Sequence, residues 1–290
     1  MMPQAPQEIQ QLVARARQIN AIELDLNGWL TNYTLTEVPD EVFTLTQLQS
    51  LYLSANALQE VSASFGYLER LVKLDLSRNQ LTDLPDSFGQ LSQLQTLYLS
   101  ENLLTTMPIS VTYLSALEEL YLNGNEINSL PKEMARLTRL ETLDLRHNML
   151  TDLPESLLLM DDLTYLDLSA NQLHTFPELL LSMTGLERLE LSHNQLTSLP
   201  LAIYKMSGLT YLGLRGNRIK RISPALLDLP GINHISLERY GQFEEGVLDL
   251  GDNPLTIPKE IIRQGIDAVR NFLLEEESQE PIGTRNTVLH

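Results

Sequence analysis

The sequence predicts an α/β fold, a solenoid in which short strands form one parallel sheet and short helical segments form the opposite side. Three observations predict it: a fixed 23-residue period, leucines that alternate as in a half-buried strand, and a Leu-Pro pair in the second half of most units. The repeated pattern is L-x-x-L-x-L-x-x-N-x-L-x-x-L-P-x-x-φ-x-x-L, in which φ is apolar. It begins at Leu48, Leu71, Leu94, Leu117, Leu140, Leu163, Leu186 and Leu209, and in weaker form at Ile232.

The first half of each unit predicts a strand with one buried face. In the unit that begins at Leu71, Leu74 and Leu76 alternate with Asp75 and Ser77, so the leucines face a core. An asparagine amide can both donate and accept hydrogen bonds, so the asparagine of each unit is expected to bond backbone groups of the turn. These residues are Asn56, Asn79, Asn102, Asn125, Asn148, Asn171, Asn194 and Asn217.

The second half of each unit predicts a short helical or 3-10 segment that opens at the proline, because proline favours the first turn of a helix. The pairs are Leu84-Pro85, Met107-Pro108, Leu130-Pro131, Leu153-Pro154, Phe176-Pro177 and Leu199-Pro200. No unit buries its leucines alone, so neighbouring units stack around one core. About ten strands at ~4.8 Å spacing predict a horseshoe with a concave sheet and a convex helical side.

The two ends predict helical caps. Ile9, Leu12, Val13, Ala16 and Ile19 follow helical spacing, and Ile262, Ile266, Val269 and Leu273 share one helix face. The predicted division is a capping helix in 1–20, the solenoid of about ten repeats in 21–257, a second capping helix in 258–275 and a flexible tail in 276–290.

Two irregularities interrupt the repeats. The first repeat has four extra residues between Leu26 and Leu35, and they include Trp29. A strand around Ile235 is followed too soon by a second strand-like run at 247–250, because a parallel crossover needs a dozen or more residues. Residues 238–246 are therefore expected to form a protruding loop, or, as the less favoured alternative, one side of an antiparallel hairpin. The aromatic residues of these interruptions either contact a partner or cover the cap edges: Trp29, Tyr240 and Phe243.

The repeats resemble those of the leucine-rich repeat family, of the 23-residue Leu-Pro type, over residues 21–258. The segment N-P-L-x-x-P-x-E-I-x-x-x-G at 253–265 is similar to the junction between repeats and GTPase domain in bacterial Roco proteins. The sequence contains no G-x-x-x-x-G-K-[ST] phosphate loop, so no nucleotide site is implied. The resemblance implies either a free-standing bacterial relative or the repeat domain of a larger Roco-type GTPase, as a regulatory or dimerising segment.

Composition limits the partners and the cellular location that the sequence predicts. The chain has 20 Lys and Arg against 38 Asp and Glu, a net charge of −18, which disfavours nucleic acid and anionic membranes as partners. It has no cysteine, no signal-peptide pattern at its start and no apolar run near the ~20 residues of a membrane span. These features predict a cytoplasmic protein. An effector or adhesin exported by a specialised machine is an alternative.

No constellation in the sequence predicts catalysis, a cofactor or a metal. His147 and His193 occupy equivalent places two repeats apart, which is roughly 10 Å and too wide for one metal ion. The prediction is therefore a non-enzymatic module that binds a protein or peptide. Carbohydrate recognition through Tyr98 and Tyr121 is a weaker alternative.

The exposed face of the predicted sheet is the expected binding surface. Its central column reads Asp25, Tyr52, Asp75, Tyr98, Tyr121, Asp144, Asp167, Glu190, Gly213 and Ser236. Tyrosine and arginine dominate interface energetics, and the acids indicate a partly basic partner. The alternative is that the acids are ordinary filler that pairs with Arg146 and Arg188. The predicted contacts are Tyr52, Tyr98, Tyr121, Asp144, Arg146, His147, Tyr165, Asp167, Arg188, Glu190, His193, Tyr211 and Arg215.

Overall fold

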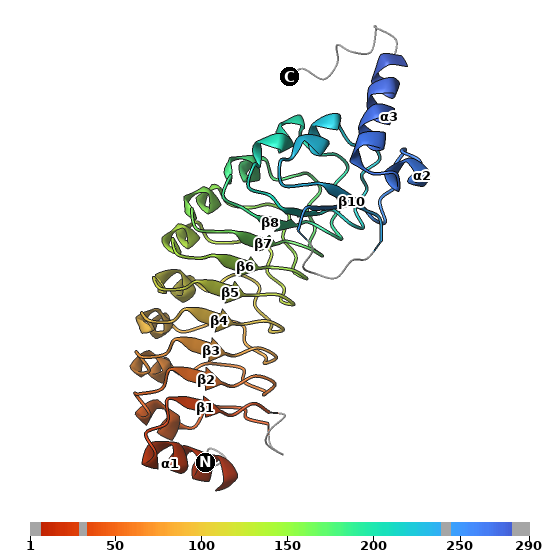
Figure 1. Cartoon of the computed structure of the whole chain (residues 1–290). Helices are drawn as coiled ribbons and strands as arrows, with labels where there is room; N and C mark the ends of the chain where they lie inside the picture. Colours follow the sequence, from red (N-terminus) through yellow and green to blue (C-terminus); the bar gives the residue numbers. More distant parts are fainter. Residues whose placement is uncertain (1–6, 29–33, 239–244, 280–290) are drawn as a thin grey trace. The chain divides into compact units, whose positions relative to one another are not determined.

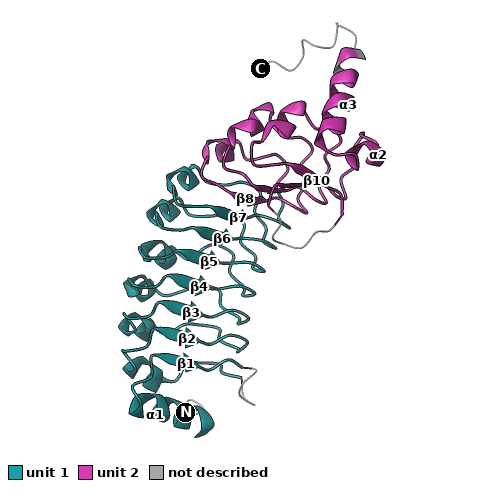
Figure 2. Ribbon diagram, in the orientation of Figure 1, with its two compact units in different colours: residues 1–172 teal, residues 173–290 magenta. Residues whose placement is uncertain are grey.

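The computed structural model describes residues 7–28, 34–238 and 245–279 (Figure 1). The chain divides into two compact units, Met1–Gln172 and Leu173–His290 (Figure 2). Within the described residues there are eleven strands, and the strand pairings inside each unit are parallel. Short 3-10 helices connect most of the strands. The predicted α/β solenoid class is thereby confirmed.

The first unit contains strands β1 to β7, which pair in chain order. In Figure 1 the 3-10 helices of this unit form a row along one side of the stacked strands. Its elements are α1 (Gln7–Gln18), β1 (Glu23–Asp25), η1 (Asp40–Thr44), β2 (Ser50–Tyr52), η2 (Ala63–Tyr67), β3 (Lys73–Asp75), η3 (Asp86–Gln90), β4 (Thr96–Tyr98), η4 (Ile109–Tyr113), β5 (Glu119–Tyr121), η5 (Lys132–Arg136), β6 (Thr142–Asp144), η6 (Glu155–Leu159) and β7 (Tyr165–Asp167).

The second unit contains the remaining strands and the C-terminal helices. Its elements are η7 (Glu178–Ser182), β8 (Arg188–Glu190), η8 (Leu201–Lys205), β9 (Tyr211–Gly213), η9 (Pro224–Asp228), β10 (His234–Ser236), β11 (Val247–Asp249), α2 (Lys259–Ile262) and α3 (Ile266–Gln279).

The prolines act as predicted. Pro85 precedes η3 and adopts an extended conformation, with φ −67° and ψ 154°, before the 3-10 turn begins at Asp86. The same arrangement opens six of the other 3-10 helices, after Pro39, Pro108, Pro131, Pro154, Pro177 and Pro200. The leucines of the strands and the apolar residue of each 3-10 helix meet in the core, where Leu74, Leu97 and Phe88 have no exposed surface.

The asparagine of each repeat bonds the backbone of its own repeat and of the preceding one. The Asn148 side-chain oxygen accepts the N–H of Ile127 at 3.0 Å, and its nitrogen donates to the carbonyls of Leu122 and Leu145, both at 3.0 Å. The asparagines before it make the same three bonds at 2.8–3.1 Å. The predicted ladder is confirmed, and it couples each repeat to its neighbour.

The residue before each asparagine lies in the left-handed region of the backbone. Ala55, Arg78, Glu101 and His147 have φ between 54° and 56°, and Gly124 fills the same place with φ 71°. The left-handed turn lets the following asparagine point inward. Most residues at this position are not glycine, so the fold tolerates a strain of about 1–2 kcal/mol per repeat.

The order of the last two strands differs from the sequence interpretation. Strand β11 lies between β9 and β10 and pairs with both in parallel, with Leu248 in register with Leu212 and Ile235. The antiparallel hairpin alternative for 238–246 is therefore wrong. The crossover argument overstated the length required: each strand has only three residues, about 10 Å, so a connection of ten residues is long enough for a parallel return.

The asparagine ladder explains this order. Asn253, four residues after Asp249, accepts the N–H of Ile219 at 3.1 Å and donates to the carbonyl of Leu214 at 2.8 Å. These are the bonds that each preceding repeat receives from its successor. At the equivalent place after β10 the sequence has Tyr240, which carries no amide. Only β11 can complete the turn that follows β9.

The caps differ in detail from the prediction. Helix α1 buries Ile9, Val13 and Ala16, whereas Leu12 and Ile19 are exposed. At the other end the predicted single helix is two helices. The helix is interrupted at Gly265, whose φ of 100° is incompatible with a right-handed helix. Helix α3 ends at Gln279 rather than near 275, since the added residues are mostly good helix formers. Residues 280–290 of the predicted tail lie outside the described part of the chain.

Asn148→Ala should destabilise the protein by about 2–4 kcal/mol, because it leaves one N–H and two carbonyls of the core without their bonds. Urea unfolding followed by circular dichroism measures this loss. Asn128→Ala is the matched control, since Asn128 is exposed. Equal midpoints for the two variants would contradict the role given to the ladder.

Ala55→Gly should stabilise the protein by about 0.5–1 kcal/mol, because glycine adopts the left-handed φ of 56° without the steric cost that alanine has there. This gain exceeds the additional backbone entropy that glycine loses on folding. Ala63→Gly, at an exposed position of η2 without positive φ, should instead destabilise. The same urea titration compares them. A loss of stability in both variants would refute the strain argument.

Candidate functional site

The exposed side of the first unit's sheet carries a column of large polar side chains. The strand register places Tyr52, Asp75, Tyr98, Tyr121, Asp144 and Asp167 next to one another in that order, on the side opposite the buried leucines. The column predicted from the repeats is therefore present in this unit. We name its residues, together with Lys73 and Glu119 beside them, the tyrosine–acid face.

Two tyrosines at the centre of the tyrosine–acid face stack on each other. The rings of Tyr98 and Tyr121 lie 4.6 Å apart with an interplanar angle of 5°. The hydroxyl of Tyr121 donates to the Glu119 carboxylate at 3.3 Å. Burial and the negative charge of Glu119 raise the pKa of Tyr121 to about 12, so the phenol keeps its proton and remains a donor at neutral pH.

A lysine that the sequence interpretation missed lies against this stack. The Lys73 ammonium is 5.3 Å from the centre of the Tyr98 ring and 5.9 Å from that of Tyr52. It is the first residue of β3, two positions before Asp75, so its side chain is on the same side of the sheet. The sequence offered this signal: the first positions of the strands in the first unit form a second column that is at least partly exposed.

The two aspartates of the face are less accessible than predicted. Asp144 and Asp167 are each only 4% exposed. The Asp144 carboxylate accepts the backbone N–H of Arg146 at 3.1 Å and forms an ion pair with its guanidinium at 3.2 Å. Asp167 accepts the N–H and the hydroxyl of Ser169 at 2.8 and 2.6 Å.

The same turn bond recurs wherever this column holds aspartate. Asp25, Asp75 and Asp249 each accept the N–H of the residue two positions later. Aspartate at this position therefore stabilises the turn after the strand, which is a structural reason for its presence. The ion pair of Asp144 with Arg146 agrees with the filler alternative for the acids. Tyrosine in the same column makes no such bond.

Crowding of the two carboxylates changes the protonation of one of them. Burial and the neighbouring Asp167 raise the pKa of Asp144 from 3.8 to about 6, although Arg146 opposes this shift. Within the first unit, the acidic part of the face thus holds more negative charge than its own cation offsets.

The predicted residues of the second unit are arranged differently. The Arg188 guanidinium lies 3.9 Å from the centre of the Tyr211 ring. Burial, together with the charge and hydrogen bond of Glu190, raises the pKa of Tyr211 above its usual range. Glu190 also accepts the Ser192 hydroxyl at 3.2 Å.

Arg215 is not the exposed basic residue that the sequence suggested. It is 7% exposed, and its guanidinium bonds Asp249 at 3.0 and 3.1 Å and Asp252 at 2.7 Å. Asp249 was missing from the predicted column, because the inserted strand β11 brings it between Gly213 and Ser236. This ion-pair network fastens β11 to β9.

Three sets of predicted residues remain. Tyr165, the first residue of β7, is partly exposed, and its hydroxyl donates to the Asp167 carboxylate at 3.5 Å. His147 and His193 are exposed and occupy the left-handed position of their repeats. Among the residues described, no three histidine, aspartate or glutamate side chains are placed to hold a metal ion. The three aromatic residues proposed for the rim, Trp29, Tyr240 and Phe243, lie outside the described residues.

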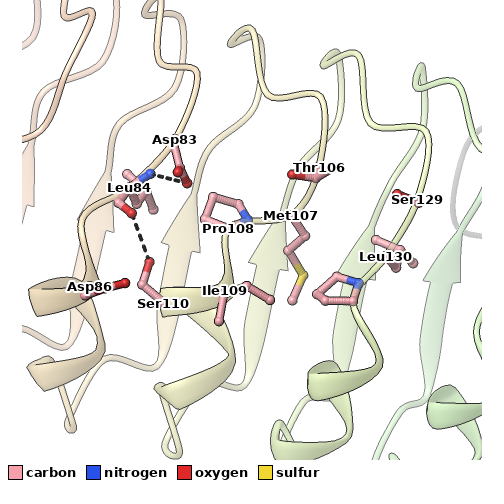
Figure 3. A pocket seen from close by; sticks show the side chains of 11 residues that line it. Asp83, Leu84, Asp86, Thr106, Met107, Pro108, Ile109, Ser110, Ser129 and Leu130 are labelled. Atoms are coloured by element: carbon pink, nitrogen blue, oxygen red, sulfur yellow. Dashed lines mark hydrogen bonds between the residues drawn. The ribbon is translucent and has the colours of Figure 1, made fainter.

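A hollow of about 430 Å³ lies on the other side of the first unit, between consecutive Leu-Pro segments (Figure 3). Two of its polar groups are engaged: Asp83 accepts the N–H of Leu84 at 2.8 Å, and the Ser110 hydroxyl donates to the Leu84 carbonyl at 3.5 Å. A second hollow, of about 480 Å³, involves the Val38-Pro39 segment of an earlier repeat. Both hollows follow the repeat geometry, since each lies between equivalent segments of consecutive repeats.

Comparison with known proteins identifies the family. The leucine rich repeat model matches residues 30–81, 69–127, 115–173, 173–219 and 184–239. The chain belongs to the leucine-rich repeat family. Domains of this family generally mediate protein–protein interactions and are typically non-enzymatic. A search of curated proteins finds no match. Among the described residues, no helix has the length and apolar character needed to cross a membrane.

Solved structures agree with this assignment. A leucine-rich repeat protein of Leptospira interrogans is 26% identical, with 86% of this chain and 77% of that chain covered and a TM-score of 0.50. The ectodomain of the Arabidopsis thaliana receptor kinase GASSHO1/SCHENGEN3, in complex with CASPARIAN STRIP INTEGRITY FACTOR 2, is 30% identical with a TM-score of 0.65. The Arabidopsis receptor kinase HAESA, in complex with the peptide hormone IDA and the co-receptor SERK1, is 26% identical with a TM-score of 0.61.

The plant receptors are much longer than the matched region. The match to GASSHO1/SCHENGEN3 covers 82% of this chain but 28% of the receptor chain, and the match to HAESA covers 73% and 37%. An internalin of Listeria monocytogenes, at 19% identity and a TM-score of 0.61, shares the fold over 89% of this chain and 82% of its own.

Asp144→Asn should make the protein more stable above pH 6, by about 1–3 kcal/mol. Between about pH 4 and pH 6 the folded state retains a proton on Asp144 that the unfolded chain has lost, so this residue's contribution to stability falls as the pH rises. Asparagine still accepts the Arg146 N–H and carries no charge.

Urea unfolding of wild type and variant at pH 4, 5, 6, 7 and 8 tests this prediction. The difference between their free energies of unfolding should grow as the pH rises from 4 to 6. Asp75→Asn is the matched control, because Asp75 makes the same turn bond and lies between two tyrosines. A variant that is less stable than wild type at pH 8 would show that the Arg146 ion pair outweighs the repulsion.

Proposed function

We propose that this protein is a non-enzymatic interaction module that binds a protein or an extended peptide on the tyrosine–acid face of its first unit. The observation that carries the proposal is the stack of Tyr98 and Tyr121 with Lys73 beside it. Both tyrosines are partly exposed on a sheet whose backbone is fixed by the ladder. Rigid aromatic groups lose little entropy on binding and contribute much contact area.

The family supports this function. Two of the similar structures are receptor complexes with a peptide hormone or a named factor, although this chain spans only part of those receptors. The tyrosines also have no evident structural need, because the aspartates of the same column serve the turn and the tyrosines do not. The earlier alternatives, a segment of a Roco-type GTPase or an exported effector, remain hypotheses, and in either setting this surface would serve to bind a protein.

The double variant Tyr98→Ala/Tyr121→Ala should lose at least tenfold in affinity for a protein partner, because interface tyrosines commonly contribute 2 kcal/mol or more. The measurement is capture from a lysate of the source organism, followed by titration of the captured protein with wild type and variant. The fold should be retained, since both side chains point away from the core.

Two control variants accompany this experiment, one for the location of the site and one for the stability of the fold. Tyr67→Ala/Tyr113→Ala removes two exposed tyrosines from the 3-10 helices and should bind as wild type. Leu122→Ala, in the core, should lower the free energy of unfolding by roughly 2–5 kcal/mol, so this variant should unfold at a lower urea concentration. Loss of binding in the Tyr67/Tyr113 variant alone would move the site to the helical side and refute the proposal.

A further inference from the structure

The tyrosine–acid face is strongly acidic on the side of the stack that faces β6 and β7. Strands β4 to β7, with the residue before each strand and the two residues after it, carry five carboxylates: Glu118, Glu119, Glu141, Asp144 and Asp167. Arg146 is the one Lys or Arg in these same positions. A surplus of four negative charges over neighbouring strands costs energy and attracts a cationic ligand.

The stack ends at this acidic border. The strand register places Tyr98 on one side of Tyr121 and Asp144 on the other. Elsewhere the chain itself supplies cations to its tyrosines, with Lys73 against Tyr98, Arg136 at 4.5 Å from Tyr113 and Arg188 at 3.9 Å from Tyr211. None of these three contacts involves Tyr121. A cation placed at Tyr121 would meet the ring and the carboxylates together.

The accessible groups decide which cation fits. Asp144 and Asp167 are buried, so they act through their field rather than by direct contact. Glu119, which accepts the Tyr121 hydroxyl at 3.3 Å, is partly exposed, and Glu141, the residue before β6, is exposed. A planar ring edged by carboxylates matches a guanidinium, which stacks on aromatic faces and bonds carboxylates through its fork of N–H groups.

We propose that the tyrosine–acid face, together with the exposed Glu141 before β6, recognises an arginine side chain of an extended peptide segment, with the guanidinium on Tyr121 and paired with Glu119 and Glu141. This inference rests on the proposed function and adds the chemistry of the partner. It orients the segment as well: Lys73, on the other side of the stack, favours an acidic or carboxyl group at the opposite end of the same peptide.

A random library of linear nine-residue peptides displayed on phage provides the probe. Selection against the full-length protein should enrich arginine at one position, and selection against Tyr98→Ala/Tyr121→Ala should not. The best peptide is then synthesised in three forms, with arginine, lysine or citrulline at that position. Citrulline has nearly the shape of arginine without its charge, so its peptide should bind about tenfold more weakly, with lysine between the two.

Charge variants of the protein locate the pairing. Glu119→Gln/Glu141→Gln should weaken the arginine peptide by about tenfold and leave the citrulline peptide nearly unchanged. Glu126→Gln/Glu155→Gln changes the net charge equally at two exposed residues of the first unit outside the strands, and it should bind the arginine peptide within about twofold of wild type.

The outcomes separate the two proposals. Selected peptides that need the tyrosines but show no arginine, or that bind equally well with citrulline, would overturn the arginine inference and leave the proposed function standing. If no peptide is selected, or if selected peptides bind the tyrosine variant as tightly as wild type, the proposed binding function of this face is itself refuted.

Discussion

The structure depends on one repeated interaction, the insertion of an asparagine side chain into the backbone of the preceding repeat. A strand that ends in a turn leaves an N–H and carbonyls facing the core, where water cannot reach them. Asn148 and its equivalents satisfy these groups across the repeat boundary. The spacing of 23 residues, the parallel register and the alignment of exposed side chains in columns all follow, because a shift by one residue would leave the bonds unmade.

This constraint also decides which strand may follow which. In the second unit the chain does not use its strands in sequence order, since only β11 brings an asparagine to the turn after β9. The ion pairs of Arg215 with Asp249 and Asp252 then reinforce that choice. A buried arginine that loses its partners would be costly, so the network favours this pairing over the chain-order alternative.

The exposed columns have two kinds of residues with different physical roles. Aspartate in the central column accepts a backbone N–H and helps to form the turn, as Asp75 and Asp167 do. Tyrosine in the same column makes no turn bond. Instead, the rings of Tyr98 and Tyr121 stack on each other, and the Lys73 ammonium lies against the Tyr98 ring. An aromatic group without a structural duty, held on a rigid sheet, is the better indicator of a binding surface.

The repeat, the strands, the 3-10 helices after the prolines, the asparagine ladder and the central column could all be predicted from the sequence alone, because each depends on contacts at a fixed separation along the chain. The repeat pattern also assigned Tyr98 and Tyr121 to neighbouring places in that column, as the strand register has them. The order of β10 and β11, the burial of Asp144, Asp167 and Arg215, and the place of Lys73 against Tyr98 were decided only by the tertiary structure. Those features depend on which side chains meet across strands and on how much water they exclude. Neither quantity has a period, so a repeat pattern cannot encode it.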